Sequence, residues 1–302
     1  MARNLKYQFL NAINSNFKEG MDKHSIKKDK SMNGTRIFSF GDRKNLIDVA
    51  SNFSNYMKEN YPDIKMVKDI NSNHIQSFLN SKSETCSQKT LEQYATKFNK
   101  LEKIVNNTYN TNANFKGFAV PSAKENTKIR NVAMSKEDFK KLQKGFANSK
   151  SAAKTAIELS AKCGLRVSET TKLQGRDINL SKGTIKVKDG KGGRDREVKI
   201  RAEDKAYFTS LKASVGDRER VCPVQPDSIN KAVQRQMERV GIANKYEDTS
   251  IHAIRKMYAQ EQYDRYREQG MEINQALGEV SKDLGHSENR LELMKEYVLD
   301  IK

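Results

Sequence analysis

The sequence is poor in the residues that build disulfides, metal sites and membrane spans. It has no tryptophan, four histidines and three cysteines, and Cys86, Cys163 and Cys222 lie far apart. An odd number of distant cysteines excludes a disulfide framework and a CxxC zinc site, and it predicts a reducing compartment. There is no apolar run of about 18 residues and no signal-peptide pattern, so we expect no membrane span and an intracellular location. Because histidine is scarce, His252 and His286 carry more weight as candidate functional residues.

Two further absences narrow the chemistry. The sequence has no carboxylate cluster of the kind that holds Mg²⁺, and no GxxxxGK[ST] loop for the phosphates of ATP. We therefore expect no metal and no other cofactor. Lysine and arginine together number 56 against 38 acidic residues, a net charge of +18. Such an excess favours a polyanionic partner, and nucleic acid is the first candidate; a basic protein with another role is the alternative.

The length of 302 residues suggests about two domains. Apolar residues at helical spacing predict a small helical domain in the first half, and a stretch rich in Asn, Thr, Lys and Gly after it reads as a linker. The basic head before this domain could bind DNA or a neighbouring subunit, or could be a frayed terminus. The predicted division is an N-terminal helix and basic arm at 1–41, a helical domain at 42–110, a linker at 111–133 and a second domain at 134–302.

The third predicted helix of the small domain begins after Ser87, a good N-cap residue. One face is apolar and the other carries lysines, which suits a phosphate backbone. A solvated lysine face is the alternative. The lysines on this face are Lys89, Lys97, Lys100 and Lys103.

The second domain offers an arginine held by a turn. Residues 151–163 are expected to form a helix that Gly164 ends, and Arg166 follows almost at once. Glu169, three residues further on, could orient the guanidinium of Arg166. The alternative is a structural ion pair on the surface, which would contribute little to stability.

A β-hairpin and a basic helix come next. Residues 184–188 and 197–200 alternate apolar and polar residues, and the tip between them, residues 189–194, contains Gly190-Lys191-Gly192. Such a tip can bend, and Lys191 could reach into a groove; an ordinary exposed hairpin is the alternative. Residues 227–240 predict an amphipathic helix that could enter a major groove. Its exposed face carries Lys231, Arg235 and Arg239.

The C-terminal part brings a histidine and an arginine together. Ser250 is expected to be the N-cap of a helix on which His252 and Arg255, three residues apart, share one face. A basic pair facing solvent or DNA is the alternative. A later helix ends at Leu284-Gly285-His286. The last helix is expected to carry an apolar stripe with Tyr297 beside it; that stripe is Leu291, Met294, Val298 and Ile301.

Taken in this order, the motifs resemble those of the tyrosine recombinase (phage integrase) family. The matching segments are Gly164 to Glu169, Gly190-Lys191-Gly192, His252 to Arg255, Leu284-Gly285-His286 and Tyr297. The resemblance covers residues 134–302, and residues 42–106 are similar, more loosely, to the core-binding domain of that family. It implies a mainly α fold with a small β-sheet or hairpin, in which a helical core-binding domain clamps DNA beside an α+β catalytic domain.

The resemblance also implies a catalytic set. It comprises an arginine pair, a hairpin lysine, two histidine positions and a nucleophile, namely Arg166 and Arg255, Lys191, His252 and His286, and Tyr297. Glu169 is a supporting residue outside this set. Two features depart from the family pattern: Tyr297 follows His286 by 297 − 286 = 11 positions, a slightly longer gap than the family's, and a short tail, residues 298–302, follows the tyrosine. Tyr258, Tyr263 and Tyr266 are alternative nucleophiles, but they precede His286 in the sequence.

The implied activity is site-specific DNA recombination or integration, as in a mobile genetic element. A phenol attacks a phosphodiester, two guanidiniums brace the non-bridging oxygens, and the 3′-phosphotyrosyl link conserves the bond energy, so that neither metal nor ATP is required. The resemblance implies a homotetramer on two double-stranded DNA sites, with accessory DNA-bending proteins as further candidates, in a bacterial or phage-type cytoplasm near the nucleoid. The alternatives are a type IB topoisomerase-like relaxing enzyme, a non-catalytic DNA-binding protein on the same scaffold, and a metal nuclease.

Overall fold

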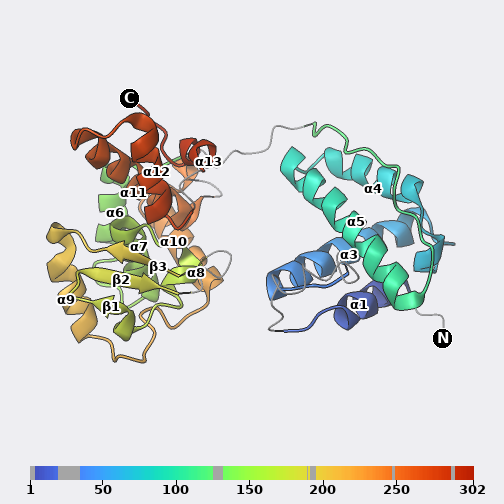
Figure 1. The fold of residues 1–302 in the computed structure, drawn as a ribbon, viewed down its shortest axis with the longest axis horizontal. Helices are drawn as coiled ribbons and strands as arrows, with labels where there is room; N and C mark the ends of the chain where they lie inside the picture. Colours follow the sequence, from blue (N-terminus) through green and yellow to red (C-terminus); the bar gives the residue numbers. More distant parts are fainter. Residues whose placement is uncertain are drawn as a thin grey trace. The chain divides into compact units, whose positions relative to one another are not determined.

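The computed structural model describes residues 4–19, 35–124, 132–188, 190, 195–246, 249–286 and 290–302. These residues are mainly helical with one small sheet, which confirms the expected fold class (Figure 1). The chain divides into two units, residues 1–129 and 130–302, here called unit 1 and unit 2. The division falls within the segment predicted as a linker, and the roles of the two units stay predictions. None of the described helices is both long enough and apolar enough to span a membrane.

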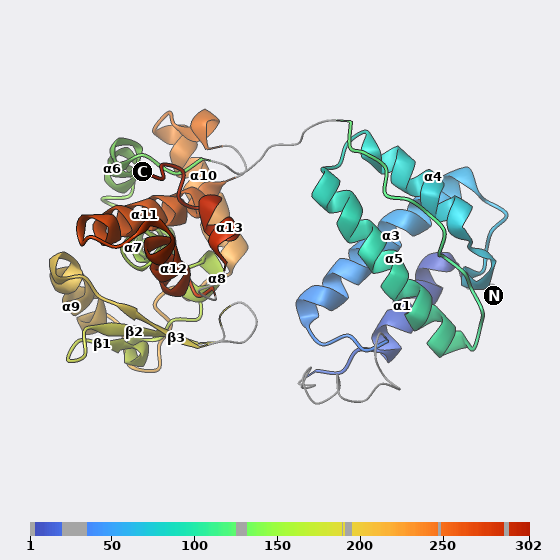
Figure 2. The same ribbon diagram turned by 45° about the horizontal axis from the view of Figure 1, so that its top comes forward.

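Unit 1 is a group of crossing helices around an aromatic core. In Figure 2, α5 crosses α3. The ring of Phe53 on α3 meets those of Phe78 on α4 and Phe98 on α5 edge to face, with centroids 5.3 and 5.0 Å apart. Phe9 of α1 is buried in the same core, so the first helix belongs to unit 1. The elements are α1 (Leu5–Ser15), α3 (Phe40–Asn60), the 3-10 turn η2 (Val67–Asp69), α4 (Ser72–Ser83) and α5 (Gln88–Tyr109).

The chain after α5 lies along the surface of unit 1. Asn110 ends the helix with φ of 51°, and residues 111–124 form no helix. Phe115 is fully buried, and its backbone N–H donates to the carboxylate of Glu102 at 2.6 Å. The N–H of Lys124 donates to the carbonyl oxygen of Ser83 at 3.0 Å. Residues 111–124 of the predicted linker are therefore packed on unit 1, while residues 125–131 lie outside the described part.

Unit 2 combines a three-stranded antiparallel sheet with helices. The strands lie side by side in the order β1-β2-β3, and Ile185 pairs with Val198 on the buried face (Figure 1). The predicted hairpin is therefore present, with β1 added to it. The elements are α6 (Lys136–Gly145), α7 (Ala152–Cys163), α8 (Val167–Thr170), η3 (Gly175–Asp177), β1 (Ile178–Asn179), β2 (Thr184–Val187), β3 (Arg196–Lys199), η4 (Ala202–Asp204), α9 (Lys205–Ala213), α10 (Pro226–Arg239), η5 (Ala243–Lys245), α11 (Ser250–Glu268), α12 (Ile273–Asp283) and α13 (Leu291–Lys295).

Helix α11 runs between two apolar clusters of unit 2. Ile254 belongs to the cluster that includes the sheet and α7, whereas Tyr258, one turn later, belongs to the cluster formed with α12 and α13. Arg255 therefore lies where the two clusters meet.

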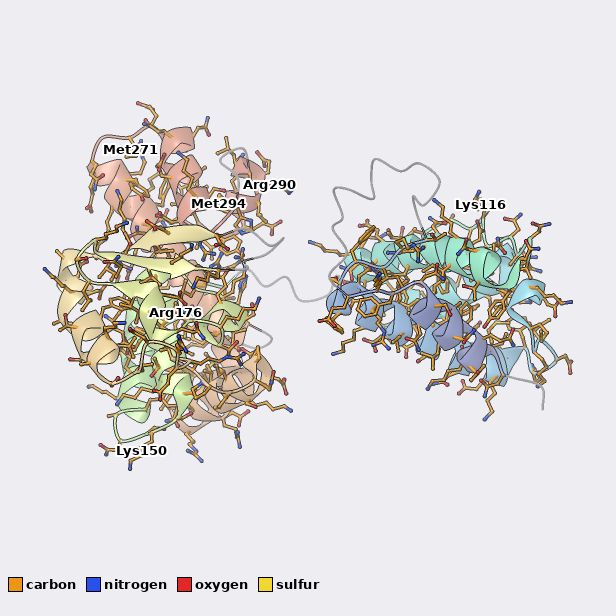
Figure 3. The ribbon with its side chains drawn as sticks, turned by 60° about the horizontal axis from the view of Figure 1, so that its bottom comes forward. Lys116, Lys150, Arg176, Met271, Arg290 and Met294 are labelled. Carbon is orange, nitrogen blue, oxygen red and sulfur yellow. The ribbon has the colours of Figure 1, made fainter. Side chains whose placement is uncertain are left out.

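Long polar side chains project from the surface of each unit, in contrast to the apolar clusters inside. Examples are the exposed Lys116 and Lys150, which are labelled in Figure 3.

Two predicted helix ends were wrong. Helix α11 begins at Ser250 with Thr249 as N-cap; Ser250 has φ of 37°, and its hydroxyl lies 3.0 Å from the amide oxygen of Asn230. The last helix, α13, ends at Lys295 and does not reach residue 301. The reason is Gln260 of α11, whose Oε1 accepts the N–H groups of residues 299 and 300 at 2.9 and 3.0 Å. A side-chain amide thus takes the backbone groups that a longer helix would have used.

Candidate active site

Arg255 is the most deeply buried charge of the site. Its side chain is 1% exposed, and its guanidinium donates to the carbonyl oxygens of Gly164 and Leu284, the latter at 2.6 Å. Gly164 ends α7 and Leu284 ends α12, so one side chain joins two helix termini to α11. Burial, together with the charge of Arg166, lowers the pKa of Arg255 to about 10. The guanidinium therefore stays protonated at neutral pH and can act on an anion.

Gly164 is the predicted helix-ending glycine, and two constraints require it. Its φ is 59°, in the left-handed region, as expected for a residue that ends a helix. A Cβ at this position would lie 2.5 Å from Cδ1 of the Tyr258 ring. No side chain fits there without displacing that ring, and the same backbone carries the carbonyl that Arg255 binds.

We expect Gly164→Ala to lower the free energy of unfolding by about 2–4 kcal/mol, because it adds a steric clash to left-handed strain. Gly183→Ala is the matched control. Gly183 has φ of 63°, but a Cβ there would meet nothing within 4 Å, so the strain alone should cost about 1 kcal/mol. Urea denaturation of the three proteins measures the difference. Equal losses in the two variants would show that the contact with Tyr258 is unimportant.

Arg166 meets both its predicted acid and one predicted histidine. Its guanidinium donates to Oε1 of Glu169 at 2.9 Å, and its backbone N–H donates to Oε2 at 2.9 Å. A second guanidinium nitrogen lies 2.8 Å from Nε2 of His286. Because a guanidinium only donates, Nε2 is the acceptor, and a neutral His286 carries its proton on Nδ1. The Glu169 side chain is 2% exposed, so this is no surface ion pair.

A third arginine, which the sequence did not reveal, holds the other side of Glu169. Arg196 at the start of β3 donates to both carboxylate oxygens at 2.8 Å. Burial would raise the pKa of Glu169, but the hydrogen bonds and charge of Arg196 and the backbone N–H of Arg166 outweigh it and lower the pKa to about 2. One signal was present: Arg196 is two residues before the buried Val198, so it lies on the inner face of the strand, where an arginine needs an acidic partner.

Tyr297 lies in the turn after α13 and is 8% exposed. Its ring centroid is 5.3 Å from that of His252, 6.0 Å from that of His286 and 5.6 Å from the guanidinium carbon of Arg255. Residues that are 45 positions apart along the chain, from 252 to 297, therefore meet around one phenol ring.

The three alternative tyrosines make other contacts. Tyr258 lies under the guanidinium of Arg201, with Cζ 5.1 Å from its centroid. The hydroxyl of Tyr263 donates to the carbonyl oxygen of Lys302 at 3.0 Å, and that of Tyr266 donates to the carboxylate of Asp283 at 2.8 Å. Their positions favour structural roles.

A cavity of about 480 Å³ adjoins the two predicted arginines. Arg166, His252 and Arg255 line one part of it, and residues of α10 line another. Among the latter is Lys231, and Arg235 further along α10 is exposed like Lys231. The cavity therefore leads from solvent to two guanidiniums beside a basic helix, which suits a phosphate group. Arg239, the third predicted cation of that helix, is also exposed.

The predicted lysines of unit 1 differ in their surroundings. Lys89 is exposed, whereas Lys97 and Lys100 both bind the carboxylate of Asp42 on α3, with Lys100 at 2.6 Å. Burial would raise the pKa of Asp42, but the two lysines outweigh it and hold the pKa below its ordinary value. Lys191 lies outside the described residues. Within the described ranges, no three His, Cys, Asp or Glu residues come together as a metal site.

Comparison with known proteins supports the resemblance. The model of the phage integrase family matches residues 132–291. The tyrosine recombinase XerA of Pyrococcus furiosus is 38% identical over 68 residues, which are 22% of this chain and 24% of that protein. The matched stretch is thus about a quarter of the length of this relative.

Solved structures share the fold. The XerH site-specific recombinase, in a post-cleavage complex with a palindromic difH substrate, has a TM-score of 0.64 at 16% identity, covering 97% of this chain and 90% of that one. A lambda integrase (75–356) dimer on a COC′ core site gives 0.61 at 16% identity, with coverages of 92% and 95%. A lambda integrase tetramer on a Holliday junction gives 0.58 at 16% identity, with coverages of 90% and 76%.

Proposed function

We propose that this chain, which belongs to the phage integrase (tyrosine recombinase) family, cleaves and rejoins DNA at specific sites through a 3′-phosphotyrosyl intermediate. One observation carries the proposal. The Tyr297 ring lies beside the Arg255 guanidinium and the rings of two histidines, one of which is bonded to Arg166. A phenol beside one guanidinium and two imidazoles, with a second guanidinium bonded to one of those imidazoles, suits attack on a phosphodiester.

The proposed step follows from the charges of these groups. The oxygen of Tyr297 attacks phosphorus, the bond to the 5′-oxygen breaks, and the tyrosine becomes joined to the 3′-phosphate. The phosphate gains negative charge in the transition state, and Arg166 and Arg255 brace its non-bridging oxygens. His252, next to the phenol, is the candidate base, and His286 is a candidate hydrogen-bond donor to the phosphate. Lys191 is the candidate acid for the leaving 5′-oxygen. Attack by another 5′-hydroxyl reverses the step and joins a new strand.

We also propose which parts of the protein hold the DNA. The exposed cations of α10 are candidates for groove or phosphate contacts: Lys231 lines the cavity that leads to the arginines, and Arg235 and Arg239 follow it along the helix. We propose unit 1 as the core-binding domain and unit 2 as the catalytic domain. The assembly we propose is a homotetramer on two double-stranded sites, because the lambda integrase of the same fold forms a tetramer on a Holliday junction. A cytoplasmic protein of a mobile element fits this activity.

The ion pairs of Asp42 give a test of the lysine face. If Lys97 and Lys100 contact phosphates, Asp42→Asn should release them and tighten binding to non-specific duplex DNA by about threefold, with a steeper salt dependence. Fluorescence anisotropy over a salt series measures both quantities. Asp48→Asn on the same helix is the control, because it removes an equal but exposed charge. If both variants bind DNA equally tightly, this face does not contact DNA.

The experiment that tests the function traps the covalent intermediate. Purified protein is incubated in EDTA with a pool of random duplexes that carry a nick, so that a short cleaved fragment diffuses away and rejoining fails. DNA that stays on the protein after denaturation is recovered and sequenced. We expect adducts with free 5′-hydroxyl ends, blocked 3′ ends and a common sequence. An absence of adducts over the whole pool would refute the proposal.

The recovered site then separates recombination from relaxation. Plasmids carrying two copies are treated with the protein and examined for recombinants. We expect deletion or inversion between the sites. Relaxation of supercoils without recombinants would instead identify a topoisomerase-like enzyme, and dependence on a divalent metal would identify a nuclease.

A further inference from the structure

Three segments of the site meet at Arg196. Its guanidinium forms two hydrogen bonds with Glu169, which follows Arg166. Its Nε donates to the carbonyl oxygen of Asp283 at 3.3 Å, at the end of α12. The next turn packs closely on it, because a Cβ at Gly285 would lie 2.8 Å from a guanidinium nitrogen of Arg196. Arg196 therefore links β3, the turn that carries Arg166 and the turn that carries His286.

The charges around Glu169 make this link more than a packing contact. Arg166 faces Glu169 from its own turn, Arg196 from β3 and Arg255 from α11, and His286 is bonded to the far side of Arg166. Three guanidiniums and one carboxylate give a net charge of 3 − 1 = +2. Without Arg196, the net charge would be +1, and Glu169 would have Arg166 as its remaining hydrogen-bonded guanidinium.

We propose that Arg196 is a positioning residue for DNA cleavage, because it shares the carboxylate of Glu169 with Arg166. Glu169 stays ionised and holds Arg166 so that it points towards His286. Because Arg196 balances part of the negative charge of Glu169, the positive charge of Arg166 remains available to the phosphate. The inference rests on the proposed function. Arg196 itself does not touch the reacting atoms, which are the oxygen of Tyr297 and the phosphodiester of the DNA. It acts through Glu169, whose second oxygen also fixes the backbone of Arg166.

The physical reason is the cost of a buried carboxylate. Burial favours the protonated form of Glu169, and Arg196 supplies the largest opposing contribution. If Arg196 is lost, the pKa of Glu169 rises, so the carboxyl becomes protonated at a higher pH than in the wild type. A protonated Glu169 loses its strong bonds to the guanidinium and N–H of Arg166, and Arg166 is then free to turn away from the phosphate.

The test compares Arg196→Met, Arg196→Lys and Arg201→Met with the wild type. Arg201 is the matched control, because its side chain is 12% exposed against 11% for Arg196, and it binds Glu261 and a backbone carbonyl without touching Glu169. Single-turnover adduct formation on the recovered DNA site is followed from about pH 5 to pH 8 at saturating protein. Thermal unfolding at each pH corrects for the folded fraction.

We expect Arg196→Met to slow adduct formation by about 10- to 100-fold near neutral pH, and to add a further fall as the pH is lowered. The wild type and Arg201→Met should lack this further fall, because the pKa of their Glu169 is about 2. Any fall that comes from the candidate base His252 should be common to all the proteins, so each rate is compared with the wild-type rate at the same pH. Arg196→Lys keeps the charge without the two-pronged contact and should recover part of the rate. In a double mutant with Glu169→Gln, Arg196→Met should cause little additional loss.

Two kinetic results would overturn the inference: a wild-type rate in Arg196→Met, or a slower rate with the pH profile of the wild type and losses additive with Glu169→Gln. Carboxyl NMR of Glu169 gives a readout that does not depend on activity, since the pKa should rise in Arg196→Met and not in Arg201→Met. If the wild type forms no adduct, the proposed function fails, whereas an unchanged pKa of Glu169 in Arg196→Met would refute the positioning role by itself.

Discussion

Replacement of Tyr297 by phenylalanine is expected to reduce the covalent DNA adduct by more than about 10⁴-fold, because it removes the attacking oxygen and no other group. The ring itself is retained, and with it the contacts to Arg255 and to the two histidines. The fold and DNA affinity should therefore be unchanged. Denaturing gel electrophoresis of the nicked substrate after incubation measures the adduct, and anisotropy measures binding.

Tyr266→Phe is the matched control for this change. It also removes one phenolic hydroxyl from unit 2, and that hydroxyl donates to Asp283. Its expected effect is a small loss of stability with adduct formation largely kept. A full amount of adduct in Tyr297→Phe, or its loss in Tyr266→Phe alone, would assign the nucleophile to another residue.

Arg255→Lys is expected to slow adduct formation by about 10³-fold, although the positive charge is kept. A lysine has one nitrogen and no planar fork, so it does not reach the carbonyls of Gly164 and Leu284 in the way the guanidinium does. The charge beside the Tyr297 ring then shifts, and one buried carbonyl loses its donor. Single-turnover rates at saturating protein separate this effect from DNA binding.

Arg265→Lys on the same helix is the control, because Arg265 is 43% exposed and pairs with Glu203 at the surface. Its rate should stay within about twofold of the wild type. Both proteins are compared by thermal unfolding, so that a stability loss in Arg255→Lys is not read as a catalytic one. A loss of less than about tenfold in Arg255→Lys would mean that the fork of Arg255 is not needed in the transition state.

Local patterns predicted what depends on local structure. Helical periodicity placed the helices of both units, and the end of α7 at Gly164 followed from the left-handed conformation that glycine favours. The order of motifs brought together Arg166, His286 and Tyr297, residues that the structure also groups. Periodicity did not predict α9 or the two-residue strand β1, the latter being too short to show an alternating pattern.

What the sequence did not reveal depends on partners distant in the chain. Glu169 was identified three residues from Arg166, but its second partner, Arg196, is 27 positions away on strand β3. The pairing of Lys97 with Asp42 spans 55 positions, so the lysine face alone gave no sign that two of its cations are engaged. The end of α13 was missed because it depends on Gln260, 39 positions before Leu299.

The measurement that most directly tests the whole account is the identity of the peptide that carries the DNA. After adduct formation, nuclease trims the DNA to a few nucleotides, trypsin cleaves the protein, and mass spectrometry locates the remaining nucleotides. Cleavage after Lys295 gives a peptide from 296 to 302 with Tyr297 as its one tyrosine, and we predict the nucleotides there. Nucleotides on the peptide 257–265, which carries Tyr258 and Tyr263, or on any peptide outside residues 296–302, would contradict it.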